Sequence, residues 1–258
     1  MTRPPLSAVI ICQNAATVLP PCLESLDFVD EILLVDSGSR DPTLEIAQRF
    51  GCRVEQHPWL GFGPQKHLAV SLARHDWVLC LDSDERVSPE LRRAILDALD
   101  NPRFQAYRFP RRNRFLGRWL YHGEGYPDYN LRLFHRQKAQ WTSHPVHEFV
   151  QPEAGVAVGV LKGDLLHESE QGIATYLDKQ NRYTSLQAGI LFEKGFRCRW
   201  HHLLLSPLVR FIKFALLRQG LRDGIPGLIH IGLGCLNTFV KYAKVLEREW
   251  NAKREGDS

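Results

Sequence analysis

The sequence lacks the glycine-rich loops with which many proteins bind nucleotides. No G-x-G-x-x-G motif follows the first apolar run, and no G-x-x-x-x-G-K-[ST] motif occurs anywhere in the chain. Both motifs bring backbone N–H groups against phosphate oxygens. Their absence argues against a dinucleotide-binding fold and against a P-loop, so a bound nucleotide would have to be held by side chains and a metal ion.

Paired cysteines are missing as well. The six cysteines include no C-x-x-C pair, and Cys12 and Cys80 lie inside apolar runs. Such residues are usually small buried hydrophobic groups of proteins from a reducing compartment. The apolar run that follows Met1–Pro5 is too short for a signal peptide. We therefore expect a protein of the cytoplasm.

The chain has no internal repeat and no low-complexity segment. Its 258 residues, 44% of them hydrophobic, are enough for one domain with a well-buried core and an appendage. The composition shifts between Gly163 and Tyr176. We place a domain boundary there and predict a first domain over residues 1–165 and a helical C-terminal region over 166–258.

Apolar runs alternate with helical patterns in the first half of the chain. The runs that read as strands are Leu6–Cys12, Glu31–Val35, Cys52–Gln56 and Trp77–Leu81. Asp41-Pro42 and Ser88-Pro89 precede segments with the signals of a helix start. The alternation predicts an α/β fold whose central sheet is mostly parallel and carries helices on both faces.

Polar side chains follow three of these strands. They are Asn14, Asp36 and the pair Asp82 and Asp84 in Asp-Ser-Asp-Glu. In open parallel sheets, ligands bind beyond the carboxyl ends of the strands, and carboxylates suit Mg²⁺ or Mn²⁺ that also binds phosphates. This predicts a metal-bound nucleoside diphosphate. The alternative is that the acidic pair caps the helix that begins near Ser88.

The ordered motifs resemble the family 2 glycosyltransferases with the GT-A fold. The pieces that carry this resemblance are Val9–Asn14, Leu23–Leu26, Asp30–Thr43, Gly61–Lys66 and Trp77–Glu85. Three later pieces are similar to the branch that builds the lipopolysaccharide core, including its β-1,4-glucosyltransferases: Phe115–Trp119, Pro127–Phe134 and Val146–Glu148. One departure is Arg40-Asp41-Pro42, where most relatives have Thr-Asp-Gly.

The resemblance implies roles for residues of the donor site. It places Asp36 at the uracil or ribose, Asp82 at the ribose and Asp84 at the metal on the diphosphate. Gln65 and Lys66 would lie near the pyrophosphate, although Lys66 could instead belong to a solvated helix face. Asn14 at the end of the first strand is a further candidate for binding the nucleotide-sugar.

The chemistry of an inverting transfer needs a base that removes a proton from the acceptor hydroxyl. Glu148 is the preferred base, because the resemblance places its segment on the acceptor side; its alternative is a structural ion pair. Asp128 is the rival base. His147 or His167 could add a metal ligand, or each could be a hydrogen-bonded neighbour of the metal ligands. Arg132 could bind phosphate or pair with an acid.

The C-terminal region is basic and interleaves cations with large apolar residues. From Lys194 to Arg254 there are twelve Lys or Arg and three Asp or Glu, a net charge of 12 − 3 = +9, against +4 for the whole chain. This pattern is typical of helices that lie in a membrane interface. Arg210, Lys213 and Arg218 interrupt its apolar stretch, and Pro207 and Pro226 bound its segments, which argues against a membrane span.

The alternative for this region is an ordinary helical cap packed on the sheet. Nucleic-acid binding is not expected, since the acidic strand ends would repel a phosphate backbone. A cytoplasmic protein that is peripheral on the inner face of the inner membrane would explain both the cations and the apolar faces.

The prediction for the whole chain is an inverting glycosyltransferase. It would move one hexose, glucose, from a UDP-sugar to an inner-core sugar of lipopolysaccharide, with Mg²⁺ or Mn²⁺ as cofactor. The processive-synthase signature Q-x-x-R-W is absent, because Phe196 stands where the glutamine would be. A transferase acting on a polyprenyl-phosphate carrier, a nucleotidyltransferase and a non-catalytic membrane scaffold remain as alternatives.

Overall fold

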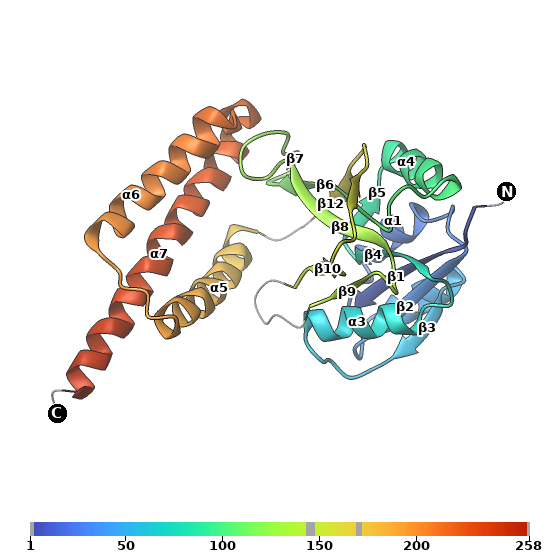
Figure 1. Cartoon of the computed structure of the whole chain (residues 1–258), viewed down its shortest axis with the longest axis horizontal. Coiled ribbons are helices and arrows are strands. Elements are labelled where there is room, and N and C mark those ends of the chain that lie inside the picture. Colours follow the sequence, from blue (N-terminus) through green and yellow to red (C-terminus); the bar gives the residue numbers. More distant parts are fainter. Residues whose placement is uncertain (1–2, 143–147, 169–171, 257–258) are drawn as a thin grey trace. The chain divides into compact units, whose positions relative to one another are not determined.

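Two compact units make up the chain (Figure 1). The computed structural model describes residues 3–142, 148–168 and 172–256. Unit 1 comprises Met1–Asn113 and Asp128–Glu168, and unit 2 comprises Arg114–Pro127 and Ser169–Ser258. The sequence predicts a boundary between residues 165 and 166. In the structure unit 1 continues to Glu168, and the segment 114–127 joins the C-terminal helices.

Unit 1 alternates strands and helices and then continues in strands. Its elements in chain order are β1 (Leu6–Cys12), α1 (Leu19–Glu24), β2 (Glu31–Asp36), α2 (Thr43–Arg49), β3 (Arg53–Gln56), α3 (Phe62–Leu72), β4 (Trp77–Asp82), β5 (Glu85–Val87), α4 (Pro89–Asp100), β6 (Ala106–Phe115), β8 (Asp128–His135), β9 (Ala139–Trp141), β10 (Val150–Pro152), β11 (Val158–Val160) and β12 (Leu165–His167). The last two residues of β6 belong to unit 2.

The first four long strands form a parallel sheet in the order β3-β2-β1-β4. All seven residues of β1 are buried, as expected for a parallel strand that is covered on both faces. The crossovers that parallel strands require are supplied by α1, α2 and α3. This part of the molecule confirms the predicted α/β class and the bounds of the predicted strands to within a residue.

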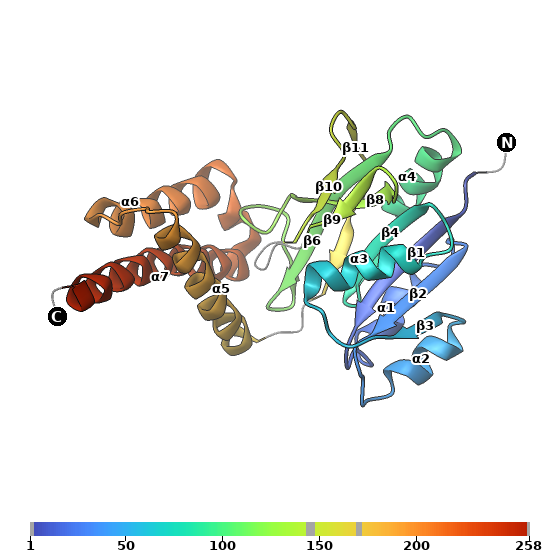
Figure 2. The same ribbon diagram turned by 60° about the horizontal axis from the view of Figure 1, so that its bottom comes forward.

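Beyond β4 the sheet becomes mixed, in the order β4-β8-β6-β12-β5. Strand β8 is antiparallel to both β4 and β6, and β12 is parallel to β6 but antiparallel to β5. A separate pair is formed by β9 and β10. Figure 2 shows β6 and β8 running beside β4. These later strands bring Arg132 and Asp128 to the neighbourhood of β4.

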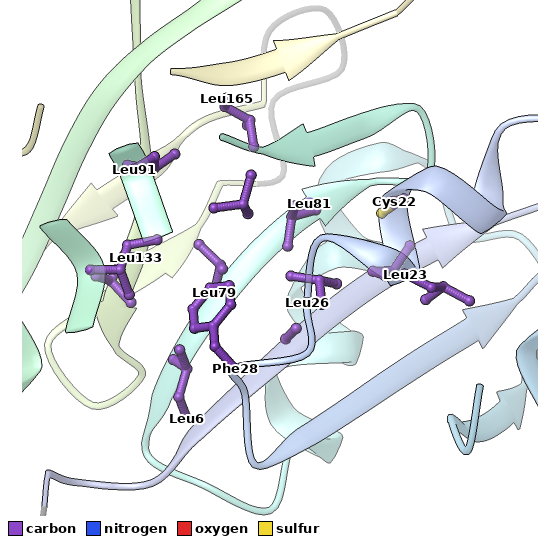
Figure 3. Close-up of a cluster of buried hydrophobic side chains, with 14 of the residues drawn as sticks. Leu6, Cys22, Leu23, Leu26, Phe28, Leu79, Leu81, Leu91, Leu133 and Leu165 are labelled. Carbon is purple, nitrogen blue, oxygen red and sulfur yellow. The ribbon is translucent and has the colours of Figure 1, made fainter. Parts of the chain in front are cut away.

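Helices cover both faces of the sheet, as predicted. On one face, Ala8 and Ile10 of β1 pack in a core with residues of α1, α2 and α4; on the other, Val9 and Ile11 pack in a core with residues of α3. Successive residues of a strand point to opposite faces, so one strand serves both cores. Figure 3 shows Leu79 and Leu81 of β4 gathered with leucines of α1 and α4.

Local sequence signals explain where the helices of unit 1 begin. Helix α4 starts at Pro89 behind Ser88, whose hydroxyl accepts a hydrogen bond from the Leu91 N–H, so Ser88 is the cap. The carboxylate of Asp41 accepts hydrogen bonds from the N–H groups of Thr43 at the start of α2 and of Ala16. Arg40-Asp41-Pro42 thus retains the aspartate of Thr-Asp-Gly, and the hydrogen bonds of Asp41 stabilise the turn before α2.

The described part of unit 2 is mainly helical, with the end of β6 and the short strand β7 as its strand residues. Its elements are β7 (Arg118–Trp119), α5 (Ile173–Glu193), α6 (Trp200–Phe211), the π-helical turn η1 (Ile212–Leu217), the 3₁₀ turn η2 (Gly220–Asp223) and α7 (Gly224–Gly256). Both α5 and α6 pack on α7. A small core forms around Ala188, Cys198 and Val245.

The segment 114–127 is tied to these helices by polar contacts. The buried carboxylate of Asp223 accepts hydrogen bonds from the N–H groups of Tyr121 and His122, at 3.0 and 2.9 Å. Arg210 forms an ion pair with Glu124 and donates to Thr238 at 3.1 Å. These contacts explain why the segment belongs to unit 2 although it lies far from the helices in sequence.

Proline marks only one of the two predicted breaks in the C-terminal region. Pro226 lies in the first turn of α7, where no N–H is needed. Pro207 lies inside α6, so the prediction that it ends a segment is wrong; the helix continues although proline removes one backbone hydrogen bond. Among the helices of the described residues, none is both long enough and apolar enough to cross a membrane.

Candidate functional site

The predicted convergence of polar groups occurs at the carboxyl ends of β1, β2 and β4. These three strands are neighbours, with Cys12 paired to Asp36 and Ile11 paired to Asp82. The ends of the strands are thus level, and Asn14 follows immediately after β1. The topology therefore brings the side chains predicted from three distant motifs to one edge of the sheet.

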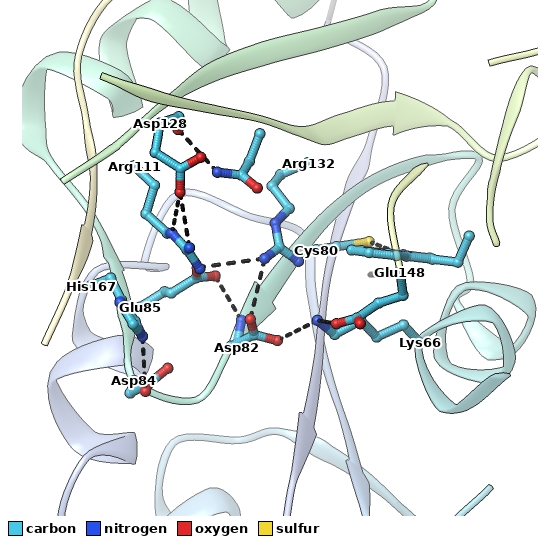
Figure 4. A network of polar contacts seen from close by, with 12 residues as sticks. Lys66, Cys80, Asp82, Asp84, Glu85, Arg111, Asp128, Arg132, Glu148 and His167 are labelled. Carbon is cyan, nitrogen blue, oxygen red and sulfur yellow. Dashed lines mark hydrogen bonds and ion pairs between the residues drawn. The ribbon is translucent and has the colours of Figure 1, made fainter. Parts of the chain in front are cut away.

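Asp82, the last residue of β4, lies between two buried cations (Figure 4). Its Oδ1 is 2.9 Å from Lys66 Nζ and its Oδ2 is 3.2 Å from Arg132 Nη2. The side chains of Lys66 and Arg132 are each 6% exposed. Lys66 is therefore not part of a solvated helix face. The alternative that Asp82 caps a helix is also wrong, because its carboxylate makes these ion pairs and Ser88 caps α4.

Lys66 links Asp82 to Glu148. Its ammonium group donates to Glu148 Oε1 at 3.1 Å and also lies 4.8 Å from the centre of the Trp141 ring. The guanidinium of Arg132 lies 5.1 Å from the same ring. Such contacts of cations with an aromatic face are attractive. One tryptophan thus fixes both cations, and Glu148 is half-buried beside them.

A second tier of charges lies behind Asp82. Glu85 is fully buried, accepts a hydrogen bond from the Asp82 N–H at 2.9 Å and has Oε1 3.6 Å from Arg132 and 3.5 Å from Arg111. Arg111 in turn donates from Nε and Nη2 to Oδ2 of Asp128, at 3.1 and 2.9 Å. The rival base Asp128 therefore joins the same network through Arg111.

The network holds Asp82 and Arg132 in their charged forms. Burial raises the pKa of Asp82, but the charges of Lys66 and Arg132 outweigh it and hold that pKa well below its usual range. Burial lowers the pKa of Arg132, but Glu85 and Asp82 raise it above its usual range. An anion that enters this site meets fixed cations rather than neutral donors.

Asp84 and His167 form a pair beside this network. His167 Nε2 lies 3.2 Å from Asp84 Oδ2, and His167 Nδ1 lies 2.7 Å from Asn113 Oδ1. An amide oxygen accepts hydrogen bonds, so Nδ1 is assigned as the donor to Asn113. In a protonated ring Nε2–H donates to the Asp84 carboxylate, and in a neutral ring the Nε2 lone pair and the carboxylate are placed to share a cation.

The donor set at Asp84 fits a divalent ion. One carboxylate oxygen and one imidazole nitrogen suit Mn²⁺, and Mg²⁺ typically takes one or two carboxylates and completes its shell with phosphate and water. Within the described part of the chain no group of three such side chains gathers to hold a metal. His147, the other predicted ligand, lies outside the described residues.

The remaining predicted residues meet at the loop after β2. Asp36 is fully buried, and its Oδ2 accepts hydrogen bonds from the N–H groups of Gly38 and Ser39 at 2.9 and 3.0 Å. Asn14 is exposed and accepts from the Arg40 N–H through Oδ1 at 2.8 Å. Gln65 is buried and donates to Ser37 Oγ at 3.1 Å. These residues shape one loop, residues 37–40, beside the cluster at Lys66.

The structure thus joins most of the predicted residues and adds others that sequence reasoning missed. Glu85, Arg111, Asn113 and Trp141 were not predicted. Glu85 had a signal, because it continues the acidic run Asp-Ser-Asp-Glu. The others come from β6 and β9 and carry no motif, since their role depends on how the second half of the sheet pairs with the first.

Comparison with known proteins decides the family. The sequence model of the family described as glycosyl transferase family 2 matches residues 7–163, well over half of the chain. The chain is a family 2 glycosyltransferase. The motif resemblance is therefore confirmed, and with it the expectation of an enzyme.

This glycosyltransferase has relatives that align over nearly the whole chain. It is 34% identical over 253 residues to the "Lipopolysaccharide core biosynthesis glycosyltransferase LpsC" of Rhizobium meliloti (strain 1021), covering 95% of this chain and 93% of LpsC. It is 28% identical over 255 residues to an uncharacterized glycosyltransferase of Rickettsia felis (strain ATCC VR-1525 / URRWXCal2), covering 94% and 89%.

Solved structures support the fold. S. aureus TarS 1-349 in complex with UDP-GlcNAc matches with a TM-score of 0.50 at 12% identity, covering 96% of this chain and 92% of that chain. Mannosyl-3-phosphoglycerate synthase from Rubrobacter xylanophilus matches with a TM-score of 0.50 at 17% identity, covering 76% and 77%. At these identities the likeness concerns the fold alone, and it agrees with the predicted GT-A architecture.

Proposed function

We propose that this glycosyltransferase moves one hexose, glucose, from a UDP-sugar to an inner-core sugar of lipopolysaccharide, with inversion at the anomeric carbon. The observation that carries the proposal is the cluster in which Lys66 contacts both Asp82 and Glu148. It puts a cation for a diphosphate beside a carboxylate that can act as a base. Glucose is the sugar that the resemblance of the later motifs implies.

The donor diphosphate would bind at Lys66 and Arg132. An ammonium group has three N–H donors, and Lys66 gives two of them to Asp82 and Glu148. The third is available to a phosphate oxygen in this arrangement. Because Asp82 and Glu85 hold both cations in place before the donor arrives, little reorganisation is needed when charge develops on the leaving diphosphate.

Asp84, with His167 beside it, would hold the divalent ion, Mg²⁺ or Mn²⁺. The ion would supply Lewis-acid stabilisation of the departing diphosphate. We propose His167 rather than His147 as the second protein ligand of the metal, because His167 Nε2 lies 3.2 Å from Asp84 Oδ2.

Glu148 would be the base. Its Oε1 faces Lys66, and its Oε2 offers lone pairs to the proton of an acceptor hydroxyl. The acceptor hydroxyl must attack the anomeric carbon from the face opposite the departing diphosphate, so as base the Glu148 carboxylate would have to face the sugar on the side away from the phosphates. Asp128 is the weaker candidate, because its contact with this region runs through Arg111.

The nucleoside would lie against the loop at residues 37–40. Asp36 would act through this loop, because its carboxylate is occupied by the N–H groups of Gly38 and Ser39. Asn14 is exposed beside the loop, and Gln65 donates a hydrogen bond to the Ser37 hydroxyl. The match to TarS, which was crystallised with UDP-GlcNAc, supports a uridine nucleotide as the donor.

The acceptor part of the proposal is supported by LpsC, whose name assigns it to lipopolysaccharide core biosynthesis and which aligns with 95% of this chain. The enzyme would work in the cytoplasm, at the inner face of the inner membrane. A polyprenyl-phosphate carrier is the alternative acceptor, and it differs by offering a phosphate rather than a sugar hydroxyl.

The proposal is tested by measuring UDP release from a panel of UDP-sugars, with Mg²⁺ or Mn²⁺ and with purified lipopolysaccharide core, for wild type and Asp84→Ala. We expect turnover of UDP-glucose that needs both the acceptor and the metal, and loss of this turnover in Asp84→Ala. Asp76→Ala serves as control, since Asp76 lies on the surface in a pair with Arg136.

The outcomes separate the parts of the proposal. Turnover with another UDP-sugar would show that the donor sugar is not glucose and would leave the proposed site unchanged. Turnover with polyprenyl phosphate but not with core would show that the acceptor is the lipid phosphate. If wild type released no UDP with any sugar and either acceptor, or if Asp84→Ala matched wild type, the proposed donor site would be wrong.

A further inference from the structure

Helix α6 is apolar but buries none of its residues. Seven of its twelve residues are Trp, Leu, Val or Phe, and in the described structure not one residue of the helix is buried. Trp200 is 70% exposed, and Leu217 in the following turn η1 is 77% exposed. Water-soluble proteins seldom expose large contiguous apolar patches, and those that do usually use them to bind a partner.

The exposed apolar residues form a row rather than a scatter. They recur at steps of four along α6 and η1, and they are Trp200, Leu204, Leu208, Ile212 and Leu216. Residues four apart lie above one another on a helix face. Leu205, Val209 and Leu217 widen this row, and all three are exposed. We call these eight residues the apolar row of α6 and η1.

The charge around the apolar row has one sign. Between Lys194 and Arg222 there are seven Lys or Arg and no Asp or Glu. Arg210 is engaged by Glu124, and the other six cations are exposed. Asp223, which ends the stretch, is buried and bonded to the segment 114–127. Glu193 precedes the stretch and the buried Glu249 accepts a hydrogen bond from the Cys198 N–H, so the surface beside the row carries an excess of positive charge.

We propose that the apolar row of α6 and η1, with its flanking cations, docks this enzyme on a bilayer surface that contains anionic phospholipid. The row would enter the boundary between headgroups and acyl chains, and the cations would contact lipid phosphates. The helices lie on the membrane and do not cross it, in keeping with the absence of a spanning helix among the described residues. The inference does not depend on which sugar or acceptor the active site takes.

A second copy of the chain is a poorer partner for this surface. In a symmetric dimer the same patch meets itself, so the six exposed cations would face their own copies. Like charges brought together at an interface are unfavourable. An anionic lipid surface meets the same cations with the opposite charge and takes up the apolar row at the same time.

Vesicle flotation of the full-length protein tests the proposal. Wild type is mixed with vesicles of phosphatidylcholine alone or of phosphatidylcholine with phosphatidylglycerol, and the bound fraction is measured against lipid concentration. We expect binding to the anionic vesicles that weakens with salt. Leu204→Ser with Leu217→Ser should lower the partition coefficient by at least about tenfold, because two apolar side chains no longer insert.

The cations are tested separately. Lys213→Gln with Arg218→Gln should lower binding to anionic vesicles by about fivefold for each charge and leave binding to phosphatidylcholine unchanged. The matched controls are Leu186→Ser and Lys179→Gln on α5, where both side chains are exposed but lie outside the basic stretch. Unchanged melting by circular dichroism shows that each variant folds.

Three results would overturn the proposal. Wild type could fail to float with anionic vesicles, or the two leucine substitutions could leave flotation as it was. Analytical ultracentrifugation could instead show a dimer that the same leucine substitutions abolish, which would assign the surface to a second copy. Release of UDP from the UDP-sugar donor in solution, with a delipidated core oligosaccharide as acceptor, should be the same for wild type and the leucine variant. Failure of the docking proposal is therefore distinct from failure of the active-site proposal.

Discussion

The two units of this chain treat their apolar residues in opposite ways. In unit 1 the strands β1 and β4 are buried along almost their whole length, and leucines from helices on either face close two cores over them. In unit 2 the core is small, and α6 exposes most of its leucines. The difference teaches that a similar apolar content can build a scaffold in one region and a surface in another.

The units also differ in how they use charge. In unit 1 buried cations form ion pairs with carboxylates, as in the pairs of Lys66 and Arg132 with Asp82. In unit 2, Arg210 is paired with Glu124, but the other six cations between Lys194 and Arg222 are exposed. We therefore propose that unit 1 carries the chemistry and that unit 2 contacts lipid.

The largest effect is expected from Glu148→Gln, which removes the proposed base and keeps the size of the side chain. The rate of sugar transfer should fall by roughly 10²- to 10⁴-fold, while donor binding changes little. Glu153→Gln is the control, because Glu153 is an exposed carboxylate paired with Lys138 in the same unit.

Asp128→Asn decides between the two bases. If Asp128→Asn showed the loss that is expected here of Glu148→Gln, while Glu148→Gln kept the wild-type rate, the base would be Asp128. The leucine substitutions in unit 2 should leave the rate with a delipidated acceptor at the wild-type level. If they lowered that rate as strongly, the division between the units would not hold.

The next effect concerns stability. Leu79→Ala in unit 1 removes a fully buried side chain and should lower the free energy of unfolding by about 2–5 kcal/mol. Leu208→Ala in unit 2 removes a side chain that is largely exposed and should change it by less than about 0.5 kcal/mol. Urea denaturation followed by circular dichroism measures both. Equal losses of unfolding free energy in Leu79→Ala and Leu208→Ala would mean that the apolar row is buried in the folded protein.

The smallest expected effect is the loss of folding stability in acid, which should begin at different pH values in the two units. Burial lowers the pKa of His230 in unit 2, although Glu124 opposes the shift. A histidine with a lowered folded-state pKa binds protons more readily when unfolded, so its contribution is complete above its usual value of 6.5 and is lost as the pH falls below it. Unit 2 should therefore begin to lose stability below about pH 6.5.

Unit 1 should resist until lower pH. Burial raises the pKa of Glu31, but Ser7, the Arg74 N–H and Arg53 lower it below its usual value of 4.5. Its contribution is therefore present above pH 4.5 and is lost as the pH falls further. Urea midpoints of unfolding, measured at several pH values, test whether unit 2 loses stability at a higher pH than unit 1. His230→Phe and Glu31→Gln should each weaken the pH dependence of the midpoint of their own unit. Loss of stability by both units at the same pH in wild type would contradict this prediction.

Much of the parallel half of the fold could be predicted from the sequence. Strands β1, β2 and β4 are continuous apolar runs, and Ser88 and Asp41 sit at helix starts, so local patterns were sufficient there. The mixed half was not predicted in detail. Strand β6 carries four arginines within ten residues, and its place beside β8 and β12 depends on pairing between distant segments.

The site divides along the same line. Asp82, Asp84 and Lys66 lie in motifs of the first half and were predicted. Trp141 and Arg111 were not, because one contacts Lys66 across 75 residues of sequence and the other reaches Asp128 through the pairing of β6 with β8. No local pattern marks such contacts. A structural ion pair of Glu148 was predicted only as an alternative to its role as base, and the identity of its partner, Lys66, was not predicted.

We propose that the cluster at the end of β4 binds a metal-bound uridine diphosphate. Calorimetric titration of UDP into wild type, Asp84→Ala and His167→Ala, each with and without Mn²⁺, tests this binding without depending on acceptor or sugar. We expect that Mn²⁺ strengthens UDP binding to wild type and that both substitutions remove this gain. Equal binding by all three proteins, with the same response to Mn²⁺, would contradict it.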